Sequence, residues 1–283
     1  MEKNSFMQTY SQLAKRMKNY QNIRSLVNLN FLQILGQYQV LSDNLQNQLA
    51  EAARLKEIYW SINREYNIKS SFFENLNKNE KPEQQKKLII YIAEKAKYSS
   101  IGFHNTDNLI LSTITKNDLL ITMGDYACEW SKKAKIPVYD EYERIDVSYV
   151  SRIKTLIYEL YISKVINRVE MIFPSNKIEN NRLIILPVEQ NKLSVAKSPE
   201  TIDIKNYSIH PNLSSFIDNL NLIYLDYTIA AAITEASFYS LKQKISRIKS
   251  LIESVEKKIE KLANDILKEK RKVATDDIII TTQ

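Results

Sequence analysis

Residues that could bind a metal or act as a nucleophile are few and far apart in this chain. The two histidines, His104 and His210, are widely separated, and neither has a second ligand type at metal-binding spacing. Cys128 is the only cysteine, which excludes an internal disulfide and a cysteine-rich metal site. It lies near Trp130 in a predicted helix, where a small buried residue is expected. We therefore expect these side chains to have no metal-binding or catalytic role.

Acidic residues and glycines also form no recognisable catalytic or nucleotide site. The acidic tract at residues 140–143 is expected to be solvated, and no nucleophile, base and orienting group combine into a set. The three glycines, Gly36, Gly102 and Gly124, do not form the closely spaced loop that brings backbone amides to a phosphate. The sequence thus predicts a non-enzymatic chain that binds no cofactor itself.

A heptad pattern of apolar residues dominates the C-terminal part of the chain. No Gly or Pro follows Asn212, so nothing in the backbone chemistry ends a helix there. At ~1.5 Å per residue this helix would be on the order of 90 Å long and would need a partner. Its predicted seam consists of Leu213, Ile217, Leu220, Tyr224, Tyr227, Ala231, Thr234, Phe238, Leu241, Ile245, Ile248, Ile252, Val255, Ile259, Leu262, Ile266, Glu269 and Val273.

The N-terminal part shows the same spacing, which suggests the partner. An antiparallel pairing of the first and last helices brings both termini towards one tip. The alternative is that both are core helices of an ordinary helical bundle, although seams of this length fit that less well. The predicted N-terminal seam consists of Leu13, Met17, Tyr20, Arg24, Val27, Phe31, Ile34, Tyr38, Leu41, Leu45, Gln48, Ala52, Leu55, Tyr59, Ile62 and Tyr66.

The middle of the chain has the pattern of a small α/β domain. Short apolar runs predict strands at residues 87–94, 109–114, 119–123, 169–173 and 182–188, the last two as a hairpin. Asp125 is expected to cap a helix that reaches Lys135, and Asp146 or Ser148 to open another. The predicted fold is α/β with long helices: an antiparallel coiled coil of the N- and C-terminal helices with an inserted, small Rossmann-like domain. The predicted boundaries are 1–75, 83–205 and 206–283.

The net charge of +7 indicates either solvated helix surfaces or an acidic partner. Lys and Arg appear along the helices in company with Glu and Asp, and no nucleic-acid-binding module is visible, so a protein partner is favoured over nucleic acid. No window approaches the ~18–20 apolar residues that span a bilayer. The N-terminal segment lacks the apolar region of a secretory signal, so a cytoplasmic location is expected.

Both ends of the chain carry residues that match one family. Lys18, Asn19, Gln21 and Ile23 match its N-terminal signature in register. In the C-terminal helix Lys249, Ile259, Leu262, Lys268, Thr275 and Ile278 match, Lys244, Ile245, Ile248, Lys270 and Asp277 are conservative replacements, and Lys270–Arg271 takes the place of an Arg-Gln pair. The segment 169–173, followed by the Leu186–Pro187 pair, is similar to the family's last two strands. The chain resembles the γ subunit, the central rotor shaft, of F-type rotary ATPases.

The resemblance implies a shaft inside a hexamer of α-type and β-type subunits, which hold ATP or ADP and Mg. Contacts with the hexamer are implied at Lys18, Asn19, Gln21, Ile23, Val27, Lys244, Lys249, Lys268, Lys270, Arg271 and Thr275. The lever region of the β subunit would face Lys18, Asn19, Gln21 and Val27. Lys268, Lys270, Arg271 and Thr275 would face loops near the tip, where basic groups suit acidic partners. The alternative is that these lysines are ordinary solvated flanks of a coiled coil.

Two departures from the family pattern point to a diverged relative. The Gly-rich turn is reduced to residues 97–105, with Gly102 and Phe103 kept, and Arg271 replaces the family's Gln. F-type-like ATPases of mycoplasmas, some of them linked to gliding, are such relatives, so the complex would transport protons or drive motility. An ε-like subunit, a membrane ring or its replacement, and a peripheral place on the inner face of the cell membrane are implied. The competing hypotheses are a coiled-coil tether whose insert binds a partner and, less favoured, an enzyme centred on the insert.

Overall fold

The computed structural model describes residues 2–68, 70, 72–73, 86–95, 100–175, 178–191 and 204–281. At residues 2–9, 100–102, 179, 206, 273 and 276–281 it describes the backbone only. The chain forms two units, residues 1–39 with 241–283 and residues 40–240. Two long helices, α1 (Glu2–Tyr66) and α5 (Leu213–Thr281), contribute to both units.

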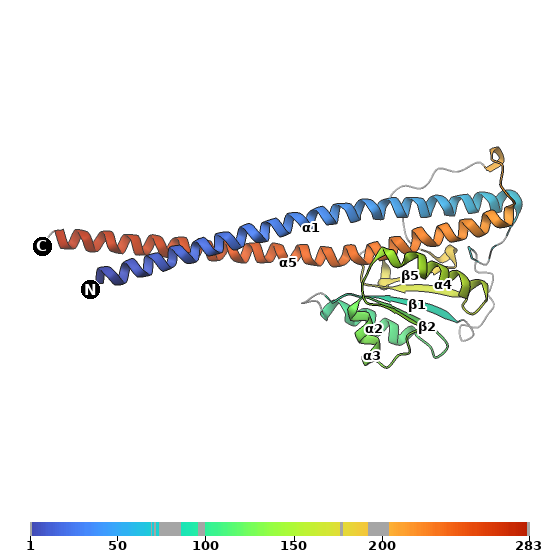
Figure 1. Ribbon diagram of the computed structural model, residues 1–283, viewed down its shortest axis with the longest axis horizontal. Coiled ribbons are helices and arrows are strands. Elements are labelled where there is room, and N and C mark those ends of the chain that lie inside the picture. The colour runs from blue at the N-terminus through green and yellow to red at the C-terminus, as the bar shows by residue number, and fades with distance from the viewer. Residues whose placement is uncertain are drawn as a thin grey trace. The chain divides into compact units, whose positions relative to one another are not determined.

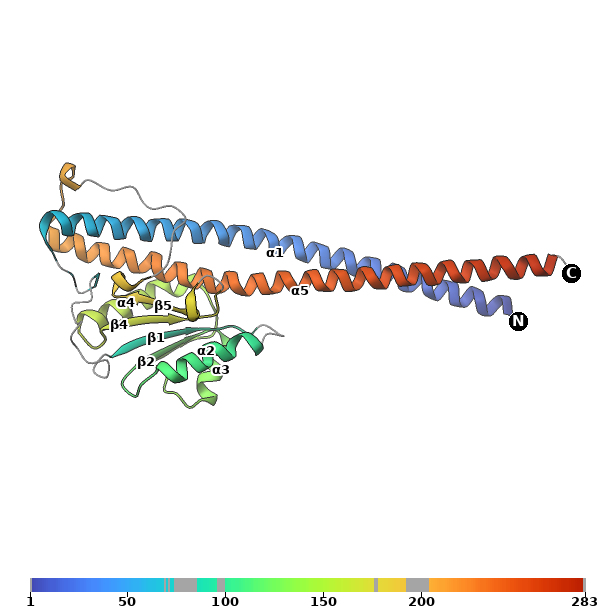
Figure 2. The ribbon, with the colours of Figure 1, turned by 180° about the vertical axis from the view of Figure 1, so that it is seen from behind.

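In the first unit the end of α5 pairs with the start of α1 in antiparallel orientation. The Lys258 ammonium nitrogen lies 5.5 Å from the centre of the Tyr20 ring, and that of Lys270 lies 5.7 Å from the centre of the Tyr10 ring. Residue numbers therefore rise along one helix as they fall along the other. Figures 1 and 2 show the two segments side by side with both termini at the same end. This is the pairing that the heptad pattern predicts.

Burial in the first unit follows the predicted seams almost residue by residue. Every predicted seam position from Leu241 to Glu269 on α5 is buried or half-buried. On α1 the same holds from Leu13 to Tyr38, with Arg24 as the exception. Arg24 is exposed because its charge has no partner in the apolar seam, so its assignment to the seam was wrong. Val273, the last predicted seam residue, lies outside the described side chains.

The second unit contains a five-stranded sheet of order β3-β2-β1-β4-β5. The first four elements are β1 (Lys87–Ile92), α2 (Ser100–Thr113), β2 (Leu119–Met123) and α3 (Asp125–Lys133). They are followed by β3 (Asp140–Tyr142), α4 (Val150–Ile162), β4 (Arg168–Ile172) and β5 (Arg182–Leu186). The pairs β1/β2, β1/β4 and β2/β3 are parallel, and β4/β5 is the predicted antiparallel hairpin.

Helices cover both faces of this sheet (Figure 1). On one face, residues of α2 and α3 such as Ile110 and Ala127 pack against Ile89 and Tyr91 of β1. On the other face, α4 and the part of α5 within this unit pack against alternate residues of the same strands. Leu225, Ile229 and Ile233 of α5 share this second cluster with α1 residues. This part of α5 is apolar nearly all round because it is enclosed by α1 and the sheet.

An aromatic contact fixes the chain that leaves α1. Tyr59 stacks on Phe73 with ring centres 3.7 Å apart and planes 6° apart. The carbonyls of Phe72 and Phe73 accept hydrogen bonds from the backbone amides of Val188 and Glu189 at 3.0 and 2.8 Å. The residues after α1 are thereby tied to the residues after β5. Most of the predicted linkers, at residues 74–85 and 192–203, lie outside the described residues, as do residues 97–99 of the reduced turn.

Two local predictions were wrong, and one strand was missed. Residues 109–114 were predicted as a strand, but residues 109–113 belong to α2, where Ile110 is buried and Leu111 is 55% exposed. Gly124, not Asp125, occupies the N-cap of α3, and the Asp125 carboxylate instead accepts hydrogen bonds from the backbone amides of Lys95 and Tyr126. Strand β3 was not predicted. It lies in the acidic tract at 140–143, where Glu141 and Glu143 are exposed as expected, and pairing with β2 outweighs the polar composition of the tract. The Asp146 cap is confirmed, since its Oδ1 accepts the Ser148 amide at 2.8 Å.

Candidate interaction surface

All eleven predicted contact residues lie in the first unit, on its two paired helices. Ten of them are exposed, and Val27 is half-buried because it belongs to the seam. Val27 therefore contributes to the pairing of α1 with α5 and offers little free surface. The exposed ten are Lys18, Asn19, Gln21, Ile23, Lys244, Lys249, Lys268, Lys270, Arg271 and Thr275.

The exposed contact residues on α1 flank the seam on both sides. Asn19 and Ile23 are four residues apart and share one side of the helix, whereas Lys18 and Gln21 are three apart and share the other. Ile23 is 42% exposed although it is apolar. A partner that touches all four must therefore reach around α1.

Some of the predicted contact residues near the end of α5 make contacts within the coil, and others only face solvent with their side chains. Lys270 points its ammonium group at the Tyr10 ring, so it also joins the two helices. Thr275 donates its hydroxyl hydrogen to the backbone carbonyl of Arg271 at 2.9 Å, and the Arg271 side chain is exposed. Lys268 is exposed as well. The tip therefore offers basic side chains to an acidic partner.

The net positive charge of the chain lies in this coil. The first unit contains 16 of the 40 Lys and Arg but only eight of the 33 Asp and Glu, so it carries +8, against −1 for the second unit. Within α1 no acidic residue occurs between Lys3 and Asp43. The charge is thus less evenly dispersed than predicted, and it favours an acidic partner for the coil.

Three exposed leucines on α1 were not among the predicted contact residues. Leu26, Leu29 and Leu32 lie outside the seam and are 66%, 64% and 62% exposed. The signal for them was present in the sequence, because residues 25–42 contain no charged side chain. A charge-free stretch on a helix whose partner covers only one face indicates a further contact surface.

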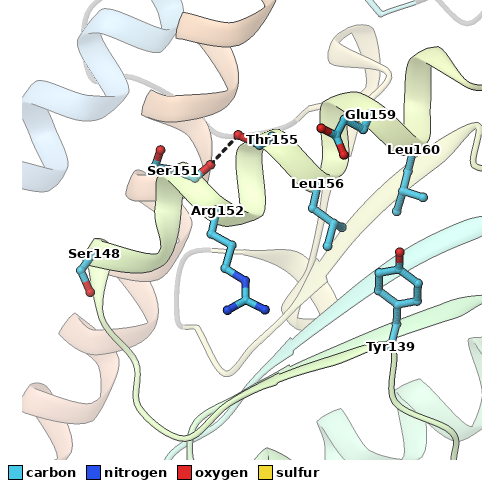
Figure 3. A pocket seen from close by; sticks show the side chains of 8 residues that line it. All are labelled: Tyr139, Ser148, Ser151, Arg152, Thr155, Leu156, Glu159 and Leu160. Carbon is cyan, nitrogen blue, oxygen red and sulfur yellow. Dashed lines mark hydrogen bonds between the residues drawn. The ribbon is translucent and has the colours of Figure 1, made fainter.

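An open pocket of about 590 Å³ lies beside α4 in the second unit (Figure 3). Arg152 and Leu156 project from α4 into the hollow, and Tyr139 faces them from the chain before β3. The Arg152 guanidinium donates to Asp140 Oδ2 at 3.0 Å and lies 5.4 Å from the centre of the Tyr142 ring. These contacts anchor α4 to the edge strand. The eight lining residues contain no nucleophile paired with a base.

The remaining candidates from the sequence are not brought together. His104 and His210 are both exposed, and Cys128 is buried, where burial raises the pKa of its thiol. Across the described residues no three His, Cys, Asp or Glu side chains cluster as a metal site. No helix in the described part of the chain is long and apolar enough to cross a membrane.

Comparisons with known proteins give distant likenesses. No family model matches the chain. An uncharacterized protein of Ureaplasma parvum is 26% identical over 283 aligned positions, which cover 94% of this chain and 91% of that protein. A chain of the rotor of the Euglena gracilis mitochondrial ATP synthase superposes with a TM-score of 0.48 at 9% identity, covering 94% of this chain and 99% of that one. A chain in the OSCP/F1/c-ring structure of the same enzyme gives 0.47 at 11% identity, covering 97% and 92%.

Proposed function

We propose that this chain is the central-stalk rotor subunit of an F-type-like rotary ATPase. It would couple ATP hydrolysis in a hexamer of α-type and β-type subunits to rotation of a shaft. The observation that carries the proposal is the antiparallel pairing of the two chain ends, in which Tyr10 meets Lys270 and Tyr20 meets Lys258. The match of both ends to the γ-subunit signature supports it. Its polar members, such as Lys18, Gln21 and Lys268, lie on the exposed flanks of this pair, and Ile259 and Leu262 lie in its seam.

The paired helices suit the mechanical task of a shaft. Gly36 is the only glycine in α1, α5 contains none, and neither helix contains proline, so each can resist bending and twisting. A stiff, asymmetric element inside a ring makes different contacts with each of three catalytic interfaces. Those interfaces are then biased towards different states, and hydrolysis at one of them is felt as a change of contact. In this proposal the chain itself has no catalytic residue and binds no nucleotide.

The α/β unit would serve as the base of the rotor. Polar contacts fix α4 and the chain after β4 to α5: Lys154 of α4 pairs with Asp226 at 2.5 Å, and Ser175 donates to Glu235 at 2.9 Å. Such contacts have directions, so they resist slippage better than apolar packing alone. In this proposal the base docks on an ε-like subunit and a membrane ring or its replacement. The complex would then lie at the inner face of the cell membrane.

The pairing within one chain weighs against the tether hypothesis. A tether would use its long seams to associate with further copies. In the first unit the seam residues of α1 and α5 already face each other, from Leu13 to Tyr38 and from Leu241 to Glu269. The described seams therefore have no apolar face left for self-association.

Co-expression with the α-type and β-type subunits of the same genome tests the proposal. We expect native mass spectrometry to give one copy of this chain per hexamer, and ATP hydrolysis to turn a bead attached to the α/β unit. The K270A/R271A double variant should reduce ATPase activity and rotation, because it removes basic groups from the shaft tip. The K116A/K133A variant, which removes two exposed lysines of the other unit, is the matched control.

Two results would contradict the rotary role. One is a chain that does not enter the complex at all. The other is a stoichiometry other than one per hexamer. Proton uptake by inverted membrane vesicles, measured with and without this chain, then distinguishes proton transport from a role in motility.

A further inference from the structure

A stretch of α1 in the coil is apolar on the side that α5 does not cover. The seam residues Phe31 and Ile34 face α5, yet Leu26, Leu29 and Leu32 on the outer side are each more than 60% exposed. A helix that pairs through one face normally carries polar residues on the opposite one. Three such leucines within seven residues indicate that the outer side of α1 is covered in the working protein.

The spacing of these leucines determines the shape of the covering surface. At 3.6 residues per turn, steps of three residues move each leucine back by about 60° around the helix. Leu26, Leu29 and Leu32 therefore spread over about 120° of the outer circumference. A flat surface meets only a narrow stripe of a helix, so the complementary surface must be concave.

Charge at the same level of the coil defines the chemistry of the partner. Residues 25–42 of α1 are uncharged, and between Glu235 and Glu253 all charged residues of α5 are basic. The contact of Tyr20 with Lys258 sets a register that puts Leu29 beside the α5 turns around Lys249. A partner that fits both helices is apolar where it meets α1 and bears carboxylates where it meets Lys244 and Lys249.

We propose that Leu26, Leu29 and Leu32 bind a protein surface of the ATPase hexamer. That surface is concave and apolar, and acidic residues flank it. This rests on the proposed function for the identity of the partner. A second copy fits poorly, because an isologous pair would bring two units of +8 together. A lipid surface fits poorly too, since a helix that lies on a membrane carries Lys and Arg beside its apolar face, whereas residues 25–42 of α1 are uncharged.

The L26Q/L29Q/L32Q variant tests this binding surface. Gln is a good helix former, so the helix content and the melting temperature of the free chain should stay unchanged. We expect its affinity for the co-expressed α-type and β-type hexamer to fall at least about tenfold, because three leucines lose their apolar contacts. The matched control is L111Q/I162Q, which changes two apolar residues of the other unit that are 55% and 56% exposed. The control should bind as the wild type does.

The outcomes separate this inference from the proposed function. If the wild-type chain does not bind the hexamer, the proposed function fails, and the assigned partner fails with it. If the wild type binds and the triple variant binds equally well, the three leucines do not form the binding surface, while the rotary role stands. Sedimentation of the free chain as a dimer that the triple variant abolishes would assign the leucines to a second copy. Leucine-dependent binding to phosphatidylglycerol vesicles would assign them to a membrane.

Discussion

The ammonium nitrogen of Lys270 lies 5.7 Å from the centre of the Tyr10 ring, so one of the predicted partner contacts also joins the two ends of the chain. Lys270 is exposed and Tyr10 is 40% exposed, which places this contact in water. A cation–π contact at an exposed site contributes about 0.5–1 kcal/mol. Lys270 is therefore both a predicted partner contact and a contact within the coil, but its contribution to coil stability is small.

The K270A/R271A variant should consequently keep its fold. Alanine is the best helix former, which offsets part of the lost contact, so we expect the free energy of unfolding to change by less than about 1 kcal/mol. Urea unfolding followed by far-UV circular dichroism measures this. The Y10A variant removes the same contact from the other side and should show a similarly small change. A large loss of helix in either variant would mean that an activity defect reports unfolding instead of a lost partner contact.

Substitution of Glu170 should destabilise the α/β unit. Glu170 is fully buried in β4, and Arg182 of β5 donates to its two carboxylate oxygens at 2.7 and 2.6 Å. Arg168 pairs with the same carboxylate. E170Q leaves two arginines without their counter-charge and should cost about 3 kcal/mol, since both are partly exposed and can be rehydrated. Thermal unfolding measures the loss. E129Q, which breaks the exposed pair of Glu129 with Lys95, should leave the midpoint unchanged.

The same carboxylate should make stability depend on pH. Burial alone would raise the pKa of Glu170, but the hydrogen bonds from Arg182 and the charges of Arg168, Arg182 and Lys87 outweigh it and lower the pKa. Because the pKa of Glu170 is lower in the folded chain, its stabilising effect is complete above the pKa of about 4.3 in the unfolded chain. The effect is lost as the pH falls through the pKa in the folded chain. The difference between wild type and E170Q should therefore be full at neutral pH and shrink below about pH 4. If wild type and E170Q differ in stability by the same amount at neutral pH and below about pH 4, the carboxylate charge contributes nothing to stability.

Sequence patterns predicted the parts of this fold that rest on local periodicity. The heptad spacing identified the seams, and short apolar runs identified β1, β2, β4 and β5. The run Leu109–Ile114 misled because a short apolar run suits a buried strand and a buried helix equally well. Strand β3 was missed because Asp140 and Glu141 do not favour a strand, and only pairing with β2 makes them one. The exposed state of Leu29 also depends on which face α5 covers, which spacing alone does not fix.

The aromatic anchor after α1 should be a strong determinant of stability in the α/β unit. Phe73 is fully buried and stacks on Tyr59, so F73A opens a cavity and should cost about 4 kcal/mol. Y59F keeps the stacked ring and removes only the hydroxyl that accepts the Ser70 amide at 3.1 Å, so it should cost about 1 kcal/mol. Chemical unfolding of both variants tests the order. A smaller loss for F73A than for Y59F would show that the stack does not hold this segment.

Replacing glycine by alanine should have opposite effects at two positions. Gly124 has a φ of 97°, and an added Cβ would lie 2.2 Å from the Ala93 carbonyl oxygen, so G124A should cost more than about 2 kcal/mol. Gly36 lies inside α1 with nothing within 4 Å of an added Cβ, so G36A should stabilise the helix by about 0.5–1 kcal/mol. Fluorescence of Trp130, which packs against Tyr91, reports on the first site, and far-UV circular dichroism on the second. If G124A unfolds at the wild-type urea concentration, the close approach of the β1 and β2 ends is not needed. If G36A lowers helix stability, Gly36 is where α1 bends or meets a neighbour.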